Sequence, residues 1–184
     1  MRRALSAIAI LSVAACSSTP PQAPPPPAAP VSTAQQAVVV LASASGSRVS
    51  GKLTIAPMGD GVHVSGEVGG LAPNGQFGFH VHEKGDCSAV DATSAGGHFN
   101  PDASAHGRAG AGAHHAGDMD NIASNAEGVA TVNVHLRGVT LGGGALNDIA
   151  GRGVIVHAAA DDYRSQPTGN AGARLACGVV KVTR

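Results

Sequence analysis

The chain has 184 residues with twelve basic and twelve acidic side chains, so its formal charge is zero and no basic run indicates a nucleic-acid partner. Only four residues are aromatic and none is Trp, which argues against the base-stacking surfaces typical of single-strand nucleic-acid binding. This length suffices for one globular domain preceded by an N-terminal extension.

The first fifteen residues have the pattern of an export signal. Arg2 and Arg3 precede an apolar run that is too short to cross a bilayer as a helix. The segment Val13–Cys16 then resembles a lipobox, the pattern at which bacterial lipoproteins are cleaved before a cysteine that becomes acylated. We therefore predict that residues 1–15 are removed and that a lipid on Cys16 anchors the protein to the periplasmic face of a bacterial membrane.

Residues 16–36 are predicted to link the lipid to the folded part. Pro20–Pro30 contains only Pro, Ala and Gln, a composition typical of an extended, polyproline-like spacer. Ser17 stands where inner-membrane lipoproteins of Gram-negative bacteria carry Asp, which favours the outer membrane. Residues 37–184 have the usual size of a single domain.

This domain is predicted to be all-β. Short runs rich in Val, Ile and Leu alternate with Gly, Asn, Asp and Ser clusters, and no window contains a helical apolar stripe. The predicted strands are Ala37–Ser43, Val49–Pro57, Val62–Val68, Phe77–Glu83, His115–Ala123, Val129–Arg137, Gly153–Ala159 and Cys177–Val182. Eight strands separated by turns indicate a sandwich or a closed barrel. The long intervals Gly85–His114 and Asp161–Arg174 are predicted to be functional loops.

Alternation along two of these strands places the first candidate metal ligands. Between Phe77 and His82 the odd positions are apolar and can enter the core, while His80 and His82 project together from the opposite face. His157 follows three apolar residues, and the same alternation places it on the face opposite to its neighbour Val156.

A larger set of potential ligands accompanies this pair. It consists of His80, His82, His98, His106, His115, Asp118 and His157. Imidazole suits Zn, Cu, Fe and Ni, and a carboxylate among histidines fits a closed zinc site. Two separate four-coordinate sites would need eight ligands, whereas seven suffice if one histidine uses both ring nitrogens. We therefore expect a paired site with a shared imidazole, and the first long loop to depend on metal for its order.

Three other histidines are expected to have no ligand role. His63 and His135 each lie between apolar strand residues, so both should face solvent. His114 adjoins His115, but the His-X-Gly-Asp spacing favours His115 as the ligand.

The three cysteines divide between two roles. With Cys16 taken by the lipid, Cys87 and Cys177 remain as one pair in an exported, oxidising compartment. A bond between them would close a loop of about 90 residues, worth roughly 4–5 kcal/mol in the chain-entropy account. The alternative is a pair of buried free thiols.

Five segments of the sequence resemble the bacterial branch of the copper/zinc superoxide dismutase family. They are Gly78–Cys87, Gly97–Pro101, His115–Asp118, Val154–His157 and Gly169–Val179. The resemblance runs from about Ala37 to Val182. It implies an eight-stranded Greek-key β-barrel that converts superoxide to O2 and H2O2 by alternating Cu(II)/Cu(I) chemistry.

The resemblance also implies a role for each potential ligand. Copper would be bound by His80, His82, His98 and His157, and zinc by His98, His106, His115 and Asp118, with His98 as the bridge. It further implies that His98 parts from copper in the reduced state and helps to deliver a proton to the product. Arg174 would guide the superoxide anion, and Asp161 would orient one histidine of each metal, with Asp162 as a weaker candidate.

One residue departs from the pattern of the family. Phe77 stands where many relatives carry a histidine, and by alternation it should face inward, so we expect altered packing and intact ligation. The rival interpretations are a non-catalytic periplasmic copper- or zinc-binding lipoprotein and a structural surface lipoprotein. A missing ligand or a missing Arg174 would favour them, and neither is missing. The sequence leaves monomer and homodimer open, although the lack of Trp slightly favours the monomer.

Overall fold

The computed structural model describes residues 30–184, so the predicted signal peptide, Cys16 and most of the predicted linker lie outside the described residues. The described part is all-β, as predicted, and contains one short 3₁₀ turn, η1 (Thr93–Ala95). Its strands are β1 (Ala37–Ser43), β2 (Ser50–Met58), β3 (Gly61–Gly69), β4 (Gln76–Phe77), β5 (Phe79–His82), β6 (Ile122–Ala123), β7 (Ala130–Arg137), β8 (Gly153–His157), β9 (Arg174–Val179) and β10 (Lys181–Val182). Among residues 30–184, no helix has the length and apolar character needed to cross a membrane.

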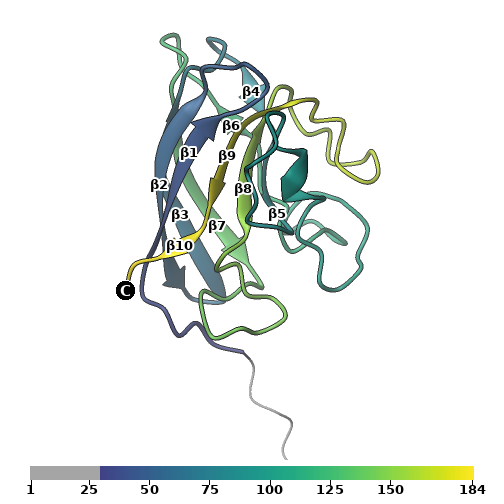
Figure 1. Ribbon diagram of the computed structural model, residues 1–184. Coiled ribbons are helices and arrows are strands. Elements are labelled where there is room, and N and C mark those ends of the chain that lie inside the picture. Colours follow the sequence, from purple (N-terminus) through teal and green to yellow (C-terminus); the bar gives the residue numbers. More distant parts are fainter. Residues whose placement is uncertain (1–29) are drawn as a thin grey trace, which may run out of the picture.

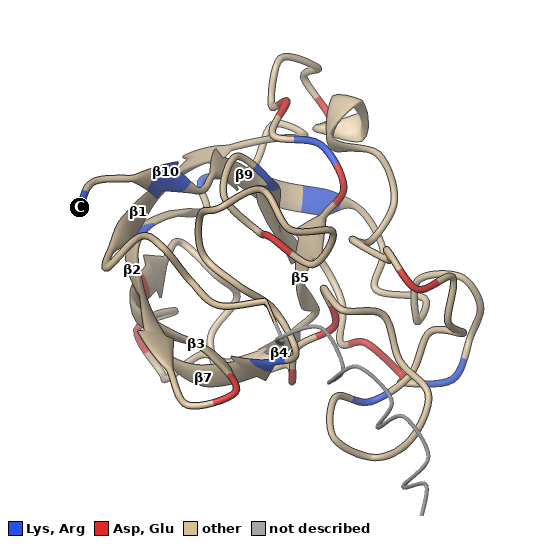
Figure 2. Ribbon diagram, turned by 90° about the horizontal axis from the view of Figure 1, so that it is seen from below, with Lys and Arg blue, Asp and Glu red and all other residues tan. Residues whose placement is uncertain are grey.

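Eight of these strands form one antiparallel sheet in the order β5-β8-β9-β1-β2-β3-β7, with β10 also paired to β1. The remaining pair, β4–β6, lies between the two ends of this sheet, because β4 leads directly into β5 and β6 contacts β7. The sheet therefore curls around a common core, as the end-on view shows (Figure 2). Non-consecutive neighbours such as β9–β1 and β3–β7 give it the crossovers of a Greek-key barrel (Figure 1).

The core follows from period-2 alternation on the strands. In β1 the buried residues are Ala37, Val39 and Leu41, while Val40 between them is 65% exposed. The β2–β3 hairpin turns through Gly59 and Asp60, and Gly59 has the positive φ of 58° that a tight hairpin requires.

Only β1 has the predicted bounds: four predicted strands differ by one or two residues at an end, including Gly153–Ala159, which ends two residues earlier at His157, and three differ more. Of His115–Ala123 only the last two residues are paired as β6, because the preceding segment wraps around the histidine cluster instead of continuing a ladder. Phe77–Glu83 is divided at Gly78, where an added Cβ would press on Ala171 and the His80 ring. The last predicted strand begins three residues earlier, at Arg174, which opens β9.

A disulfide fixes the first long loop to the barrel. Cys87 and Cys177 are bonded, with their Cα atoms 5.7 Å apart and a separation of 90 positions in the sequence, which confirms the predicted pairing. Cys177 on β9 and Ile155 on β8 pack with Ala92 and Ala95 of the loop in a small apolar cluster separate from the main core. The loop is thus held over the outer side of β8 and β9 (Figure 1).

Candidate metal centre

The edge strand β5 carries two of the histidines, and a strand next to it ends at a third. His80 and His82 lie on β5, which is paired with β8 so that His80 is opposite Ile155 and His82 opposite Gly153. Phe77, Phe79 and Val81 point into the main core, as predicted. The two histidines point the other way but are not exposed to solvent: both side chains are fully buried, because the long loop covers them.

The loop reaches β5 through an irregular ladder of backbone hydrogen bonds. Phe99 N–H donates to the Val81 carbonyl (2.8 Å), Gly117 N–H donates to the Phe99 carbonyl (2.8 Å), and Val81 N–H donates to the Gly117 carbonyl (2.9 Å). Gly117 has to be a glycine, because a Cβ there would collide with the Val81 carbonyl oxygen. This ladder places His98, next to Phe99, and Asp118, next to Gly117, beside the histidines of β5.

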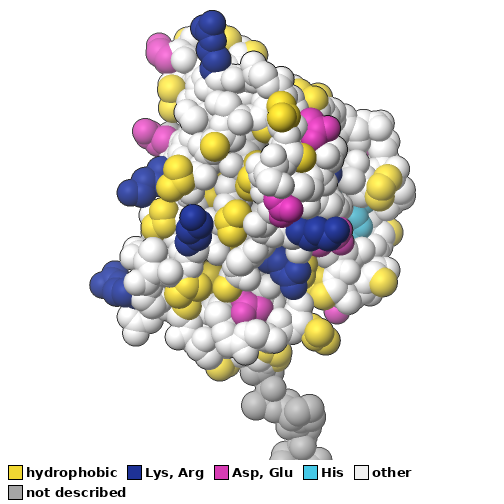
Figure 3. Space-filling view, in the orientation of Figure 1, with side chains coloured by type: hydrophobic (Ala, Val, Ile, Leu, Met, Phe, Trp, Pro, Cys, Tyr) yellow, Lys and Arg dark blue, Asp and Glu magenta, His cyan; other side chains and the backbone are white. Residues whose placement is uncertain are grey.

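The seven predicted ligands form two groups of four, and His98 belongs to both. His80, His82, His98 and His157 make up the first group, and His98, His106, His115 and Asp118 make up the second. Within each group one nitrogen or oxygen atom per residue lies within 4.8 Å of all the others. All seven side chains are buried, and little histidine reaches the face of the molecule shown in Figure 3, where charged side chains of both signs are dispersed.

In the first group, one ring nitrogen of each histidine carries the proton of a hydrogen bond, so the other ring nitrogen carries no proton. His80 Nε2–H donates to Asp161 (2.8 Å), and His82 Nδ1–H donates to the Gly96 carbonyl (2.9 Å). The remaining nitrogens, Nδ1 of His80 and Nε2 of His82, therefore present lone pairs. His80 Nδ1 and His98 Nε2 are buried and have no hydrogen-bond partner among residues 30–184.

His157, the fourth histidine of this group, provides further evidence that the group binds a cation. His157 Nδ1–H points at the Gly172 carbonyl (3.3 Å), so its Nε2 is also a lone-pair atom. That atom lies 3.3 Å from Nε2 of His82. Two acceptor nitrogens held this close in a buried site repel each other unless a cation lies between them, and Cu prefers imidazole nitrogen. The first group therefore fits copper.

The second group has the composition of a zinc site. Asp118 is within 2.7 Å of His98 Nδ1, 3.0 Å of His106 Nδ1 and 3.4 Å of His115 Nδ1. The Nδ1 atoms of His106 and His115 are buried and, in the described part of the chain, have no partner in hydrogen-bonding geometry. Three imidazole nitrogens around one carboxylate match the ligands of small closed zinc sites.

The protonation states of the buried residues favour metal binding. Burial lowers the pKa of His80 to about 4 and that of His157 to about 3, because an imidazolium is poorly solvated there. Burial also lowers the pKa of His82. Burial alone would raise the pKa of Asp118, but hydrogen bonds from His98 and from backbone amides outweigh it and lower that pKa. At pH 7 these three histidines are thus neutral and Asp118 is ionised, the forms that ligate metals.

Asp161 connects the two groups at their rear. Its Oδ2 accepts from His80 Nε2 (2.8 Å) and its Oδ1 from His106 Nε2 (3.0 Å), so one carboxylate orients one histidine of each group. This is the arrangement that the resemblance implied. Asp162 is not part of it, because its carboxylate accepts hydrogen bonds within its own loop from Arg164, Ser165 and Asn170.

Arg174 lies at the copper-side edge of the cluster. It is opposite His157 in the β8–β9 pairing, and its guanidinium donates to the Ala92 carbonyl (2.7 Å) and the Gly96 carbonyl (2.6 Å). The Gly96 carbonyl also accepts from His82, so one loop carbonyl links Arg174 to a predicted copper ligand.

The three histidines expected to have no ligand role belong to neither group. His63 hydrogen-bonds to Asn133 (2.7 Å), and its neighbour across the sheet, His135, pairs with Asp60 (3.1 Å). His114 donates from Nδ1 to the Gly112 carbonyl (2.7 Å), whereas the adjacent His115 points at Asp118. The preference for His115 over His114 therefore agrees with the geometry.

No sequence pattern identifies the residues that hold Asp161 in place. Asn121 donates to the Asp161 carbonyl (2.9 Å) and accepts from the Asp161 amide (2.8 Å), while the Tyr163 hydroxyl accepts from the Asn121 amide (2.9 Å). Gln166 likewise exchanges two hydrogen bonds with the backbone of His106. Asn and Gln in polar loops carry no pattern that distinguishes such contacts from solvent exposure.

The sequence of this chain is similar to those of proteins of known activity. The family model described as copper/zinc superoxide dismutase (SODC) matches residues 49–180. Copper–zinc superoxide dismutase 1 of Aquifex aeolicus is 42% identical over 134 residues, 71% of this chain and 79% of that protein. The copper–zinc superoxide dismutase of Caulobacter vibrioides is 40% identical over 146 residues, 77% of this chain and 83% of that protein.

Solved structures show the same fold. A SOD-like protein from Bacillus subtilis is 37% identical and superimposes with a TM-score of 0.71, covering 78% of this chain and 97% of that one. The clock protein EA4 is also 37% identical, with a TM-score of 0.72 and coverage of 85% of this chain and 99% of that one.

Proposed function

This chain belongs to the copper/zinc superoxide dismutase family and dismutates superoxide to O2 and H2O2, and we propose that it does so at the two histidine groups described above, as a lipid-anchored exported enzyme. The observation that carries this assignment is the convergence of buried, unpartnered ring nitrogens on two points that share His98. His80 Nδ1 and the Nε2 atoms of His82, His98 and His157 would hold copper. His98 Nδ1, His106 Nδ1, His115 Nδ1 and Asp118 would hold zinc.

The reaction joins two superoxide anions and two protons to give O2 and H2O2. Copper supplies the one-electron chemistry by alternating between Cu(II) and Cu(I), and zinc supplies a fixed charge because it does not change oxidation state. The chain's own residues bind the anion, exclude water and move a proton. Arg174 attracts superoxide to the copper side, and His98 takes up a proton at Nε2 and passes it to the departing product.

Dismutase activity of the metal-loaded protein tests the catalytic assignment. The loaded protein should accelerate superoxide decay, and cyanide, which binds accessible copper, should abolish the acceleration. Loading with zinc alone should give an inactive protein. Full metal content without cyanide-sensitive activity would instead support a non-catalytic metal-binding protein.

Replacing Asp161 by asparagine should weaken both metals. Asparagine has the same shape but offers one acceptor oxygen, so it cannot accept from both His80 and His106. Loss of such a partner typically costs about 10- to 100-fold in metal affinity. Titration with competing chelators measures this for each metal.

Asp162→Asn is the matched control for this change, because all the hydrogen bonds of the neighbouring carboxylate within residues 30–184 are to its own loop. It should bind both metals as the wild type does. Equal affinities in the two variants would show that Asp161 does not orient the ligands.

The lipid anchor rests on the sequence pattern at Val13–Cys16, with Cys16 as the acylated residue. We expect residues 1–15 to be removed and residues 16–36 to connect the lipid to the domain at the periplasmic face of a membrane, most simply the outer one. The prediction of a monomer or a homodimer stays a prediction.

Cys16→Ser should abolish acylation while leaving the domain's metal content unchanged, because Cys16 lies outside the residues that form the barrel. Mass spectrometry of the mature N-terminus after expression in a Gram-negative host measures the lipid directly. An unmodified wild-type Cys16 would refute the lipobox interpretation.

A further inference from the structure

His82 and His98 face each other across a short antiparallel bridge between β5 and the long loop. Two backbone hydrogen bonds close this bridge on either side: Glu83 N–H donates to the Gly97 carbonyl (3.0 Å), and Phe99 N–H donates to the Val81 carbonyl (2.8 Å). The ring centroids of the two histidines are 5.1 Å apart. The bridge therefore sets the separation of two residues that would bind the same copper ion.

Arg152 contacts both sides of this bridge. Its Nη1 donates to the Glu83 carbonyl (2.6 Å), which belongs to the β5 side. On the loop side, its guanidinium lies over the Phe99 ring, 4.4 Å from the ring centroid, in cation–π geometry. The Phe99 side chain is only 3% exposed and belongs to the main core, so the arginine binds a fixed aromatic face.

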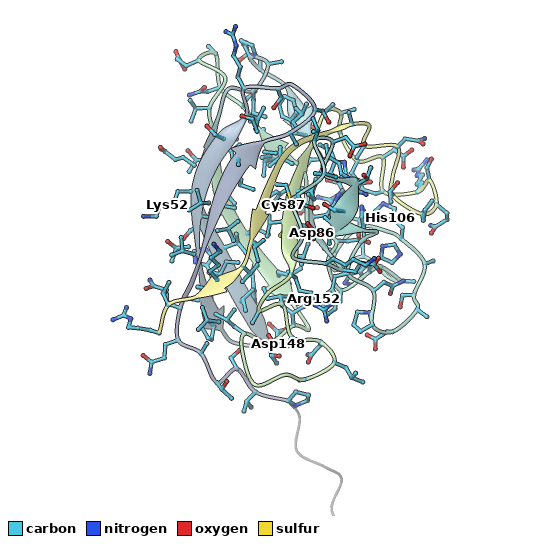
Figure 4. All side chains as sticks on the ribbon, in the orientation of Figure 1. Lys52, Asp86, Cys87, His106, Asp148 and Arg152 are labelled. Carbon is cyan, nitrogen blue, oxygen red and sulfur yellow. A yellow bond between two sulfur atoms is a disulfide. The ribbon has the colours of Figure 1, made fainter. Side chains whose placement is uncertain are left out.

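Arg152 is itself held rigidly at the start of β8 (Figure 4). Its amide donates to the Ile149 carbonyl (3.0 Å), and its carbonyl accepts from the Val180 amide (2.9 Å). Nearby, the buried Asp148 carboxylate accepts from three backbone amides of its own loop, and the Asp148 carbonyl lies 3.3 Å from Arg152 Nε. The guanidinium thus projects from a part of the barrel that does not belong to the metal loop.

The contact extends to the zinc side through Phe99. The Phe99 carbonyl accepts from the Gly117 amide, and Gly117 immediately precedes Asp118. A displacement of Phe99 would therefore move His98, which precedes it, and Asp118 together.

We propose that Arg152 is a positioning residue that clamps the bridge between β5 and the metal loop and thereby fixes His82 and His98 relative to each other. It touches neither substrate nor metal and acts through Glu83 and Phe99. The inference rests on the proposed assignment of His82 and His98 as copper ligands, but its structural part concerns the bridge alone.

The test compares Arg152→Met with wild type, because methionine keeps an apolar stem over Phe99 and loses the donor and the charge. In the metal-free protein, hydrogen exchange of the Glu83 and Phe99 amides should become about 10-fold faster, while amides of the β2–β3 ladder keep their protection. In the loaded protein, copper should dissociate about 10-fold faster, as for loss of other outer partners. The electron paramagnetic resonance spectrum of Cu(II) should shift.

Arg48→Met is the matched control, because Arg48 is exposed and its side chain makes no hydrogen bond or ion pair with any of residues 30–184. It should leave every one of these measurements unchanged. Phe99→Leu provides a second variant that keeps apolar bulk and the Glu83 contact but removes the π face, and it should show the same spectral shift.

Unchanged exchange at Glu83 and Phe99 with an unchanged copper spectrum in Arg152→Met and in Phe99→Leu would overturn the proposal. A lower melting temperature with wild-type spectrum and dissociation rate would also overturn it, since that is a purely structural role. The proposed function is tested separately on the wild-type protein, and it fails if that protein does not bind copper and zinc or, once loaded, has no cyanide-sensitive dismutase activity.

Discussion

Replacing His98 by alanine is expected to impair copper and zinc binding together and to abolish dismutase activity. His98 is the residue common to both ligand groups, and each of its ring nitrogens faces one group. On the proposed assignment, its loss would leave each metal with three ligands and would remove the group that passes a proton to the product. The loss of affinity should exceed the roughly 10- to 100-fold typical of an outer partner, for both metals. Elemental analysis after dialysis against a weak chelator measures it.

Two other histidines provide the controls for this experiment. His106→Ala should mainly empty the zinc site, because His106 belongs to the second group alone. His114→Ala should retain both metals, since His114 lies beside the predicted ligand His115 but, within residues 30–184, its side chain hydrogen-bonds only to the Gly112 carbonyl. Full retention of copper and zinc by the His98 variant would exclude a shared ligand.

Removal of the Arg174 charge is expected to slow the reaction without emptying either metal site. The guanidinium is fixed by two loop carbonyls beside His82 and His157, so its charge lies close to the copper side of the cluster. A cation at the entrance to a site raises the local concentration of an anionic substrate, and such steering changes on-rates by about 10-fold or more. Arg174→Ala should also lose about 1 kcal/mol of stability per lost hydrogen bond.

Charge variants separate steering from the structural effect of these hydrogen bonds. Arg174→Lys keeps the charge and should retain most of the rate, whereas Arg174→Glu should be slower than Arg174→Ala because it repels the substrate. Since salt screens the attraction, the wild-type rate should fall with ionic strength and the alanine variant should respond less. Pulse radiolysis over a salt series measures these rates. Equal rates in all four proteins, fully loaded, would show that Arg174 does not guide the anion.

Alternation and spacing were sufficient to predict most of the fold. β1 has the predicted bounds, β3 is one residue longer than predicted at each end, and β7 begins one residue later, because their apolar residues alternate regularly toward one core. The prediction of a strand over His115–Ala123 was wrong, because the backbone there turns so that the His115 and Asp118 side chains meet, and this turn interrupts the strand pairing. The strand is divided at Gly78, where the backbone lies close to Ala171, and no local sequence pattern reveals this contact.

The grouping of the candidate ligands could be predicted from the sequence because chemistry restricts metal ligands to a few residue types, whereas their role as ligands stays a prediction. The His80–His82 pair follows from strand alternation, and the structure brings the other five predicted ligands to it. The burial of this pair was not apparent, since alternation alone says only that it faces away from the core. The supporting contacts could not be predicted either. Those of the Gly96 carbonyl, Asn121 and Arg152 are hydrogen bonds between a side chain and the backbone of a residue distant in the sequence.

Anomalous diffraction from the metal-loaded protein at the copper and zinc absorption edges tests the shared-ligand site most directly. We expect a copper peak among His80 Nδ1 and the Nε2 atoms of His82, His98 and His157. A separate zinc peak should lie among the Nδ1 atoms of His98, His106 and His115 and the Asp118 carboxylate, with the His98 ring between the two peaks. A single peak, or two peaks with no imidazole in common, would contradict the assignment.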